Sequence, residues 1–222
     1  MKLWFFGDSY AADHNQNSQW QHILKDYYNC EAVFDAANGY SNERILKGVD
    51  SALCNISPQD WVIVITTDSI RRWFFENLPQ YSNYYNLSSV VPDLSKSQLA
   101  ALEQYTRHLQ NTTVDNFNYV CQIEWLRNIP HRNLIHLQGF YNTDVVCAGC
   151  AQVQGTLTES ISELEFVNNR QRELWYARSD TRLNHLSWRN HIILADVIRS
   201  VIDGETTTID LTQGFESTFL TV

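Results

Sequence analysis

A continuous apolar run, Trp61-Val62-Ile63-Val64-Ile65, constrains the fold more than any other segment of this chain. Its length suits a single strand, and its β-branched residues favour extended backbone. A strand that is apolar at successive positions is buried on both faces, which is typical of a parallel sheet with helices on each side. The run therefore predicts the central strand of an α/β domain.

Shorter apolar segments on either side alternate with helical patterns. Strands are expected at 2–6, 31–36 and 133–137, and helices at 16–28, 45–53, 95–109, 112–128 and 188–202. Alternating strands and helices predict parallel strands joined by right-handed crossovers. We expect a three-layer α/β/α fold with a mainly parallel, flavodoxin-like five-stranded sheet.

One domain accounts for the 222 residues, because no glycine- or proline-rich linker divides them. We expect that domain to cover 1–203, with 204–222 as a C-terminal tail or an extra strand. The segment 149–155 is expected to be a loop, and 158–177 is a further helical candidate.

Charge excludes some partners. The formal net charge of -9 argues against a nucleic-acid partner, which needs clustered lysine and arginine to displace counterions. No apolar stretch approaches the roughly 20 residues of a membrane span, and no secretion signal is visible. We expect no membrane partner, a location in the cytoplasm or with a phage particle, and an oligomeric state that the sequence leaves open.

Ligand chemistry in such folds lies outside the carboxyl ends of the strands. Gly7-Asp8-Ser9 follows the first strand, Asn38-Gly39 follows the second, and Asp68 follows the central strand. A serine hydroxyl is a weak nucleophile unless a base takes its proton, and His185 stands just before the last helix. Gly-Asp-Ser alone is more often a turn, and Asp8 itself is interpreted as holding that turn by local hydrogen bonds. Its position in this order of segments favours hydrolysis.

These segments resemble the motif blocks of the SGNH hydrolases, also called the GDSL esterase/lipase superfamily, in a divergent form of phage or bacterial type. The resemblance implies that Ser9 is the nucleophile and that the N–H groups of Ser9 and Gly39 bind the oxyanion. It also implies that His185 acts as general base and then acid, and that no metal or organic cofactor takes part. The matches are short but are spread over most of the chain.

The third block departs from the family pattern. The family has Gly-x-Asn-Asp after the central strand, whereas this chain has Thr66-Thr67-Asp68-Ser69, so the asparagine donor is missing. Either a hydroxyl of Thr67 or Ser69, or the amide of Asn42, substitutes for it, or the site works with two donors. Asp68 and Arg71, also in this region, are candidate substrate contacts.

The triad acid is the second departure. The family spacing is Asp-x-x-His, and Arg182 occupies the expected place, so Asp180 is the candidate acid for His185. If no carboxylate reaches the imidazole, a Ser-His dyad remains.

A serine esterase acting on a small-molecule or glycan ester is the function expected from these residues. An O-acetylated carbohydrate is the first substrate candidate, because aromatic residues at 73–87 can form a wall of a sugar site, and a lipid or general acyl ester is the second. A catalytically weak or inactive glycan-binding module on the same fold is the rival.

The cysteine pair and the histidines other than His185 are not expected to take part in chemistry. Cys147 and Cys150 form a C-x-x-C pair, but no second ligand pair accompanies it, so we expect two loop thiols rather than a zinc or redox centre. The remaining histidines are interpreted as surface or helix-cap residues: His14, His22, His108, His131, His136 and His191. His191, inside the last helix, is further interpreted as structural.

Overall fold

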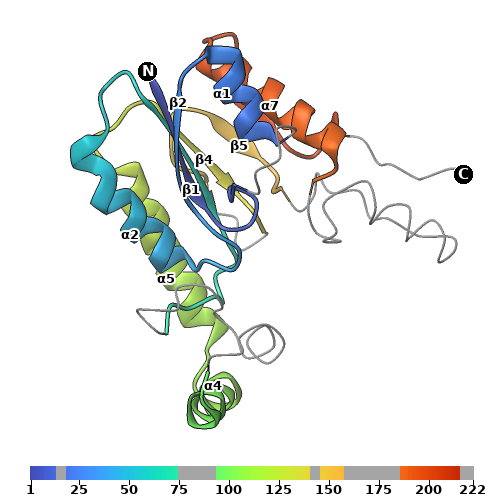
Figure 1. Ribbon diagram of the computed structural model, residues 1–222. Helices are drawn as coiled ribbons and strands as arrows, with labels where there is room; N and C mark the ends of the chain where they lie inside the picture. Colours follow the sequence, from blue (N-terminus) through green and yellow to red (C-terminus); the bar gives the residue numbers. More distant parts are fainter. Residues whose placement is uncertain (14–18, 75–93, 141–145, 158–185, 216–222) are drawn as a thin grey trace, which may run out of the picture.

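The computed structural model describes residues 1–13, 19–74, 94–140, 146–157 and 186–215 (Figure 1). His185 and Asp180, the expected base and acid, lie outside the described residues, as does the helical candidate 158–177. The aromatic segment is described only at Trp73 and Phe74.

A parallel sheet of four strands forms the centre of the protein. Its strands are β1 (Lys2–Gly7), β2 (Glu31–Ala36), β3 (Trp61–Thr66) and β4 (Leu134–Gln138), arranged in the order β2-β1-β3-β4. Every pairing is parallel, and β3 lies inside the sheet between β1 and β4. The predicted central strand and the α/β class are therefore confirmed.

Helices cover both faces of this sheet (Figure 1). On one face lie α1 (Trp20–Tyr28) and α7 (Trp188–Ile202), and on the other lie α2 (Asn42–Ala52) and α5 (Thr112–Arg127). These helices begin and end within a few residues of the expected ranges, because each has an apolar face that packs on the sheet.

Alternating side chains of the strands build a core on each side of the sheet. Phe5 packs edge-on against Trp20 of α1, with ring centroids 5.2 Å apart. Its neighbour Phe6 points to the opposite face and belongs to the cluster that contains Ile45 of α2 and Tyr119 of α5. The continuous apolar strands arise because both of their faces are buried.

The remaining elements lie outside the main sheet. They are the single-turn helix η1 (Leu53–Asn55), α4 (Lys96–His108), β5 (Gln152–Gln154) and β6 (Thr208–Asp210). β5 pairs with β6 as a separate two-stranded parallel sheet, so the expectation of a loop throughout 149–155 is wrong. Three-residue strands are too short to produce an alternating pattern. In the part of the chain that the structure describes, no helix has the length and apolarity needed to cross a membrane.

His136 is a fully buried residue of β4, not the surface or cap histidine expected from the sequence. Its Nδ1 accepts a hydrogen bond from the Ala148 N–H at 3.0 Å, so the ring proton is on Nε2, 2.9 Å from the Thr66 hydroxyl. Burial lowers the pKa of His136 from 6.5 to about 3, because an added proton on Nδ1 would face an N–H donor in a dry site.

Acid should destabilise the protein through His136. A lowered histidine pKa contributes stability that is complete above the unfolded pKa of 6.5 and is lost as the pH falls toward about 3. We expect the free energy of unfolding to fall by about 2–3 kcal/mol from this residue alone between pH 6.5 and about pH 4. Urea unfolding of the wild type and of His136→Gln across this pH range measures the contribution of His136. An equal dependence of the unfolding free energy on pH in the two proteins would contradict the lowered pKa of His136.

Candidate active site

Ser9 lies in a tightly held turn at the carboxyl end of β1. The carbonyl of Asp8 accepts hydrogen bonds from the N–H groups of Ala11 and Ala12, both at 3.0 Å. The carbonyl of Tyr10 accepts from the Trp20 indole at 2.9 Å, which ties the turn to α1. Such anchoring on both sides fixes the backbone of Ser9 before any substrate arrives.

Glycine is required where this turn leaves the strand. A Cβ added to Gly7 would lie 2.7 Å from the Cβ of Ala11 and 3.0 Å from the carbonyl oxygen of Ile65. The turn therefore sits directly against the end of β3, which brings Ser9 close to the third block.

Asp8 joins the Ser9 turn to the loop after β3. Its carboxylate is completely buried and accepts hydrogen bonds from the Tyr10 N–H at 3.1 Å, the Thr67 hydroxyl at 2.8 Å and the Arg71 guanidinium at 3.0 Å. The bond from Tyr10 confirms that Asp8 holds its own turn. Burial raises the pKa of Asp8, and the charge of Arg71 opposes that shift.

Asn42, the first residue of α2, clamps the same loop from the other side. Its Oδ1 accepts from the Thr67 N–H at 2.8 Å, and its Nδ2 donates to the carbonyls of Thr67 and Asp68 at 3.1 and 3.5 Å. Ser41 caps α2 by accepting a hydrogen bond from the Arg44 N–H. The side-chain amide of Asn42 thus binds both the N–H and the carbonyl of Thr67, as a paired backbone segment would, and holds the loops after β2 and β3 together.

The three side chains expected as sources of the third oxyanion donor have partners within the protein. The Thr67 hydroxyl donates to Asp8, the Asn42 amide donates to backbone carbonyls, and the Ser69 hydroxyl donates to Asn116 Oδ1 at 2.7 Å. Each side chain that was expected to donate to a substrate donates to another group of the protein in this structure.

Three backbone N–H groups at this edge of the sheet are without an acceptor among the residues that the structure describes. In the described part of the chain, no acceptor receives a hydrogen bond from the N–H of Ser9, Gly39 or Asp68. Several adjacent N–H groups do have acceptors, among them those of Tyr10, Tyr40, Thr67, Ile70 and Arg71. The three uncommitted donors follow the neighbouring strands β1, β2 and β3, and the backbone of Gly39 has a φ of 78°, which favours glycine.

The Ser9 side chain is also uncommitted. Ser9 is partly exposed, and no described residue forms a hydrogen bond with its hydroxyl. Acyl transfer to serine requires a reachable hydroxyl and N–H donors that can bind the oxyanion.

Asp68 and Arg71, the expected substrate contacts, have different surroundings. The Asp68 carboxylate accepts from the Ile70 N–H at 3.1 Å and so folds back on its own loop. Arg71 pairs with Asp8, and its guanidinium lies 4.9 Å from the centre of the Phe140 ring. The sequence analysis did not predict this Asp8–Arg71 pair. Its only signals were an acidic residue next to the serine and an arginine shortly after β3.

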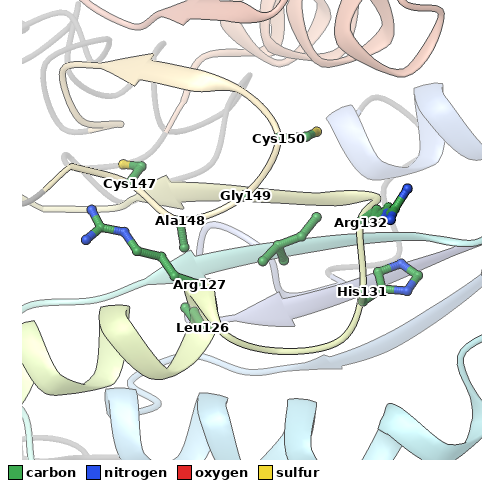
Figure 2. A pocket seen from close by; sticks show the side chains of 9 residues that line it. Leu126, Arg127, His131, Arg132, Cys147, Ala148, Gly149 and Cys150 are labelled. Atoms are coloured by element: carbon green, nitrogen blue, oxygen red, sulfur yellow. The ribbon is translucent and has the colours of Figure 1, made fainter.

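A separate hollow of about 380 Å³ lies beside β4, lined by residues that precede this strand and by the segment 147–150 that follows it (Figure 2). Cys147 and Cys150 line it on either side of Ala148 and Gly149, and the two thiols lie apart (Figure 2). Burial raises the pKa of Cys147 to about 11 and raises that of Cys150, which disfavours reactive thiolates. Over the described ranges, no group of three or more His, Cys, Asp or Glu side chains is arranged to hold a metal ion.

No family model matches this chain, and no curated protein matches it. Function therefore has to be inferred from the geometry around Ser9.

Proposed function

We propose that this protein is a serine ester hydrolase of the SGNH type, in which Ser9 forms an acyl-enzyme intermediate. The observation that carries the proposal is the set of three uncommitted N–H groups, on Ser9, Gly39 and Asp68, at the carboxyl ends of three neighbouring strands, together with a partly exposed serine hydroxyl that no described residue bonds. Order β2-β1-β3-β4 supports the finer view of the fold as a flavodoxin-like, five-stranded α/β/α sandwich.

In the proposed reaction, Ser9 Oγ attacks the ester carbonyl and His185 takes the hydroxyl proton. The carbonyl oxygen becomes an oxyanion and accepts hydrogen bonds from the N–H groups of Ser9, Gly39 and Asp68. His185 then donates the proton to the departing alcohol, and water hydrolyses the acyl-enzyme by the same steps in reverse order. Asp180 is the proposed partner that orients the imidazole, and no cofactor takes part.

The N–H of Asp68 replaces the asparagine side chain of the family pattern in this proposal. The clamp by Asn42 supports that role, because it binds the carbonyl of the peptide group that contains the Asp68 nitrogen and also binds the peptide groups before and after it. An O-acetylated carbohydrate remains the first proposed substrate. A glycan-binding module without catalysis is the rival.

Covalent labelling tests the proposal directly. A fluorophosphonate reacts with an activated serine and mimics the tetrahedral intermediate, so one adduct should form on the peptide that contains Ser9. Ser9→Ala and the wild type denatured beforehand should remain unlabelled. Absence of an adduct on Ser9 in the native protein would overturn the proposal and favour the binding module.

Replacement of Asp68 by proline removes the proposed third donor without touching Ser9. We expect Asp68→Pro to lower kcat for an activated ester about a hundred- to a thousandfold, as loss of one oxyanion donor does. Asp68→Ala keeps the N–H and should lose less than about tenfold, which separates the backbone from the carboxylate. Circular dichroism and thermal melting of both variants check that they fold, and equal losses in the two folded variants would contradict the role of the N–H.

A further inference from the structure

Arg71 has far more hydrogen-bonding capacity than its surroundings use. A guanidinium carries five N–H donors, and within the described residues its only hydrogen-bond partner is Asp8 Oδ2, reached through Nη1. The side chain is only 13% exposed, so most of it has been removed from water. Neither Nε nor Nη2 is among the fully buried, unpartnered atoms, so the unused edge of the guanidinium remains accessible.

Two sets of contacts connect Arg71 to the residues on either side of the nucleophile. Asp8, the residue before Ser9, binds Arg71 at 3.0 Å. Tyr10, the residue after Ser9, packs its ring against Phe140 with centroids 5.7 Å apart, and Phe140 lies under the guanidinium at 4.9 Å. Arg71 is thus connected to both neighbours of Ser9 and is held in one orientation by them.

The adjacent arginine, Arg72, uses more of its donors within the protein. Arg72 pairs with Glu43 of α2 and with the buried Asp115 of α5, and so ties these two helices together. Arg71 and Arg72 therefore differ in role. Arg72 pairs with carboxylates of two helices, whereas Arg71 keeps a planar pair of donors, Nε and Nη2, that no described residue binds. That fork matches the geometry of a carboxylate.

We infer that Arg71 is a specificity-determining residue that selects esters whose acyl group carries a carboxylate close to the scissile bond over esters whose acyl group is neutral there. This inference rests on the proposed esterase function. The carboxylate lies in the plane of the guanidinium and accepts hydrogen bonds from Nε and Nη2, while Nη1 stays on Asp8. Phe140 and Asp8 hold the guanidinium in place, so little side-chain entropy is lost on binding.

Matched esters measure this selectivity. We expect kcat/KM for mono-p-nitrophenyl succinate to exceed that for p-nitrophenyl isocaproate, whose isopropyl group replaces the carboxylate, by about ten- to a hundredfold, with each value divided by the rate of hydrolysis by hydroxide. Because Arg71→Gln alone would strand Asp8, the test variant is the double replacement Asp8→Asn with Arg71→Gln, and Arg71→Lys is the second variant. The ratio should fall to about one in the double variant and to an intermediate value in Arg71→Lys. Arg132→Gln, at the opposite edge of the sheet, should keep the ratio of the wild type.

Binding separates failure of this inference from failure of the proposed function. Calorimetric titration of Ser9→Ala with monomethyl succinate should detect binding that is at least about tenfold weaker after the Asp8→Asn/Arg71→Gln replacement is added. If neither ester is turned over by the wild type but this difference in binding is found, the esterase proposal fails and Arg71 still binds carboxylates. A succinate-to-isocaproate ratio near one in an active wild type, or a ratio that survives in the folded double variant, overturns the inference.

Discussion

Replacement of Ser9 by alanine is expected to lower kcat/KM for p-nitrophenyl acetate by at least about a thousandfold, and by as much as about a millionfold if His185 activates the hydroxyl fully. The loss is this large because the acyl-enzyme cannot form without the nucleophile. The change keeps the N–H groups of Ser9, Gly39 and Asp68, so the remaining rate reports what these proposed oxyanion donors contribute without the nucleophile.

Stability should hardly respond to the same change. No described residue bonds the Ser9 hydroxyl, so its removal breaks no hydrogen bond in the part of the chain that the structure describes. We expect a melting temperature within about 2 °C of the wild type. Ser69→Ala is the matched control: it loses the bond to Asn116 and about 1 kcal/mol of stability, yet should retain turnover within about tenfold. Equal turnover by Ser9→Ala and wild type would refute the proposed mechanism.

The sheet could be predicted because its sequence signal is local. A run such as 61–65 is apolar at every position only if both faces are buried, and that condition restricts it to the interior of a parallel sheet. The caps of the helices are local as well: Ser95, the residue before α4, forms a capping box with Gln98. The short pair β5 and β6 gave no such signal.

Roles at the site were harder to predict because they depend on contacts between distant residues. Asn42 and Thr67 are 25 residues apart, and Asp8 and Arg71 are 63 apart. A side chain of any of these types can either donate a hydrogen bond to a substrate or bind another part of the protein, and only the fold decides between the two roles. Backbone N–H groups have no residue signature at all, so the third candidate donor on Asp68 could not be identified before the hydrogen bonds were known.

Replacement of Arg71 by methionine is expected to have the largest effect on stability, about 3–5 kcal/mol at pH 8, because it strands the carboxylate of Asp8 in a fully buried site. Adding Asp8→Asn should recover most of that loss, since no buried charge then remains. The matched control is Arg44→Met, which breaks the pair with Asp35, whose two side chains are 20% and 30% exposed. That variant should cost no more than about 1 kcal/mol.

The loss of unfolding free energy in Arg71→Met should also depend on pH, and the direction of the Asp8 pKa shift in the wild type determines how. Burial outweighs Arg71 and raises the folded pKa of Asp8 above 3.8, and removal of the cation must raise it further. A carboxyl group with a raised folded pKa stabilises the fold below its unfolded pKa, and that contribution is lost as the pH rises through the folded value. The gap in unfolding free energy between wild type and Arg71→Met should therefore widen from pH 5 to pH 8 in urea titrations. A gap independent of pH would mean that Asp8 is not the group left without its partner.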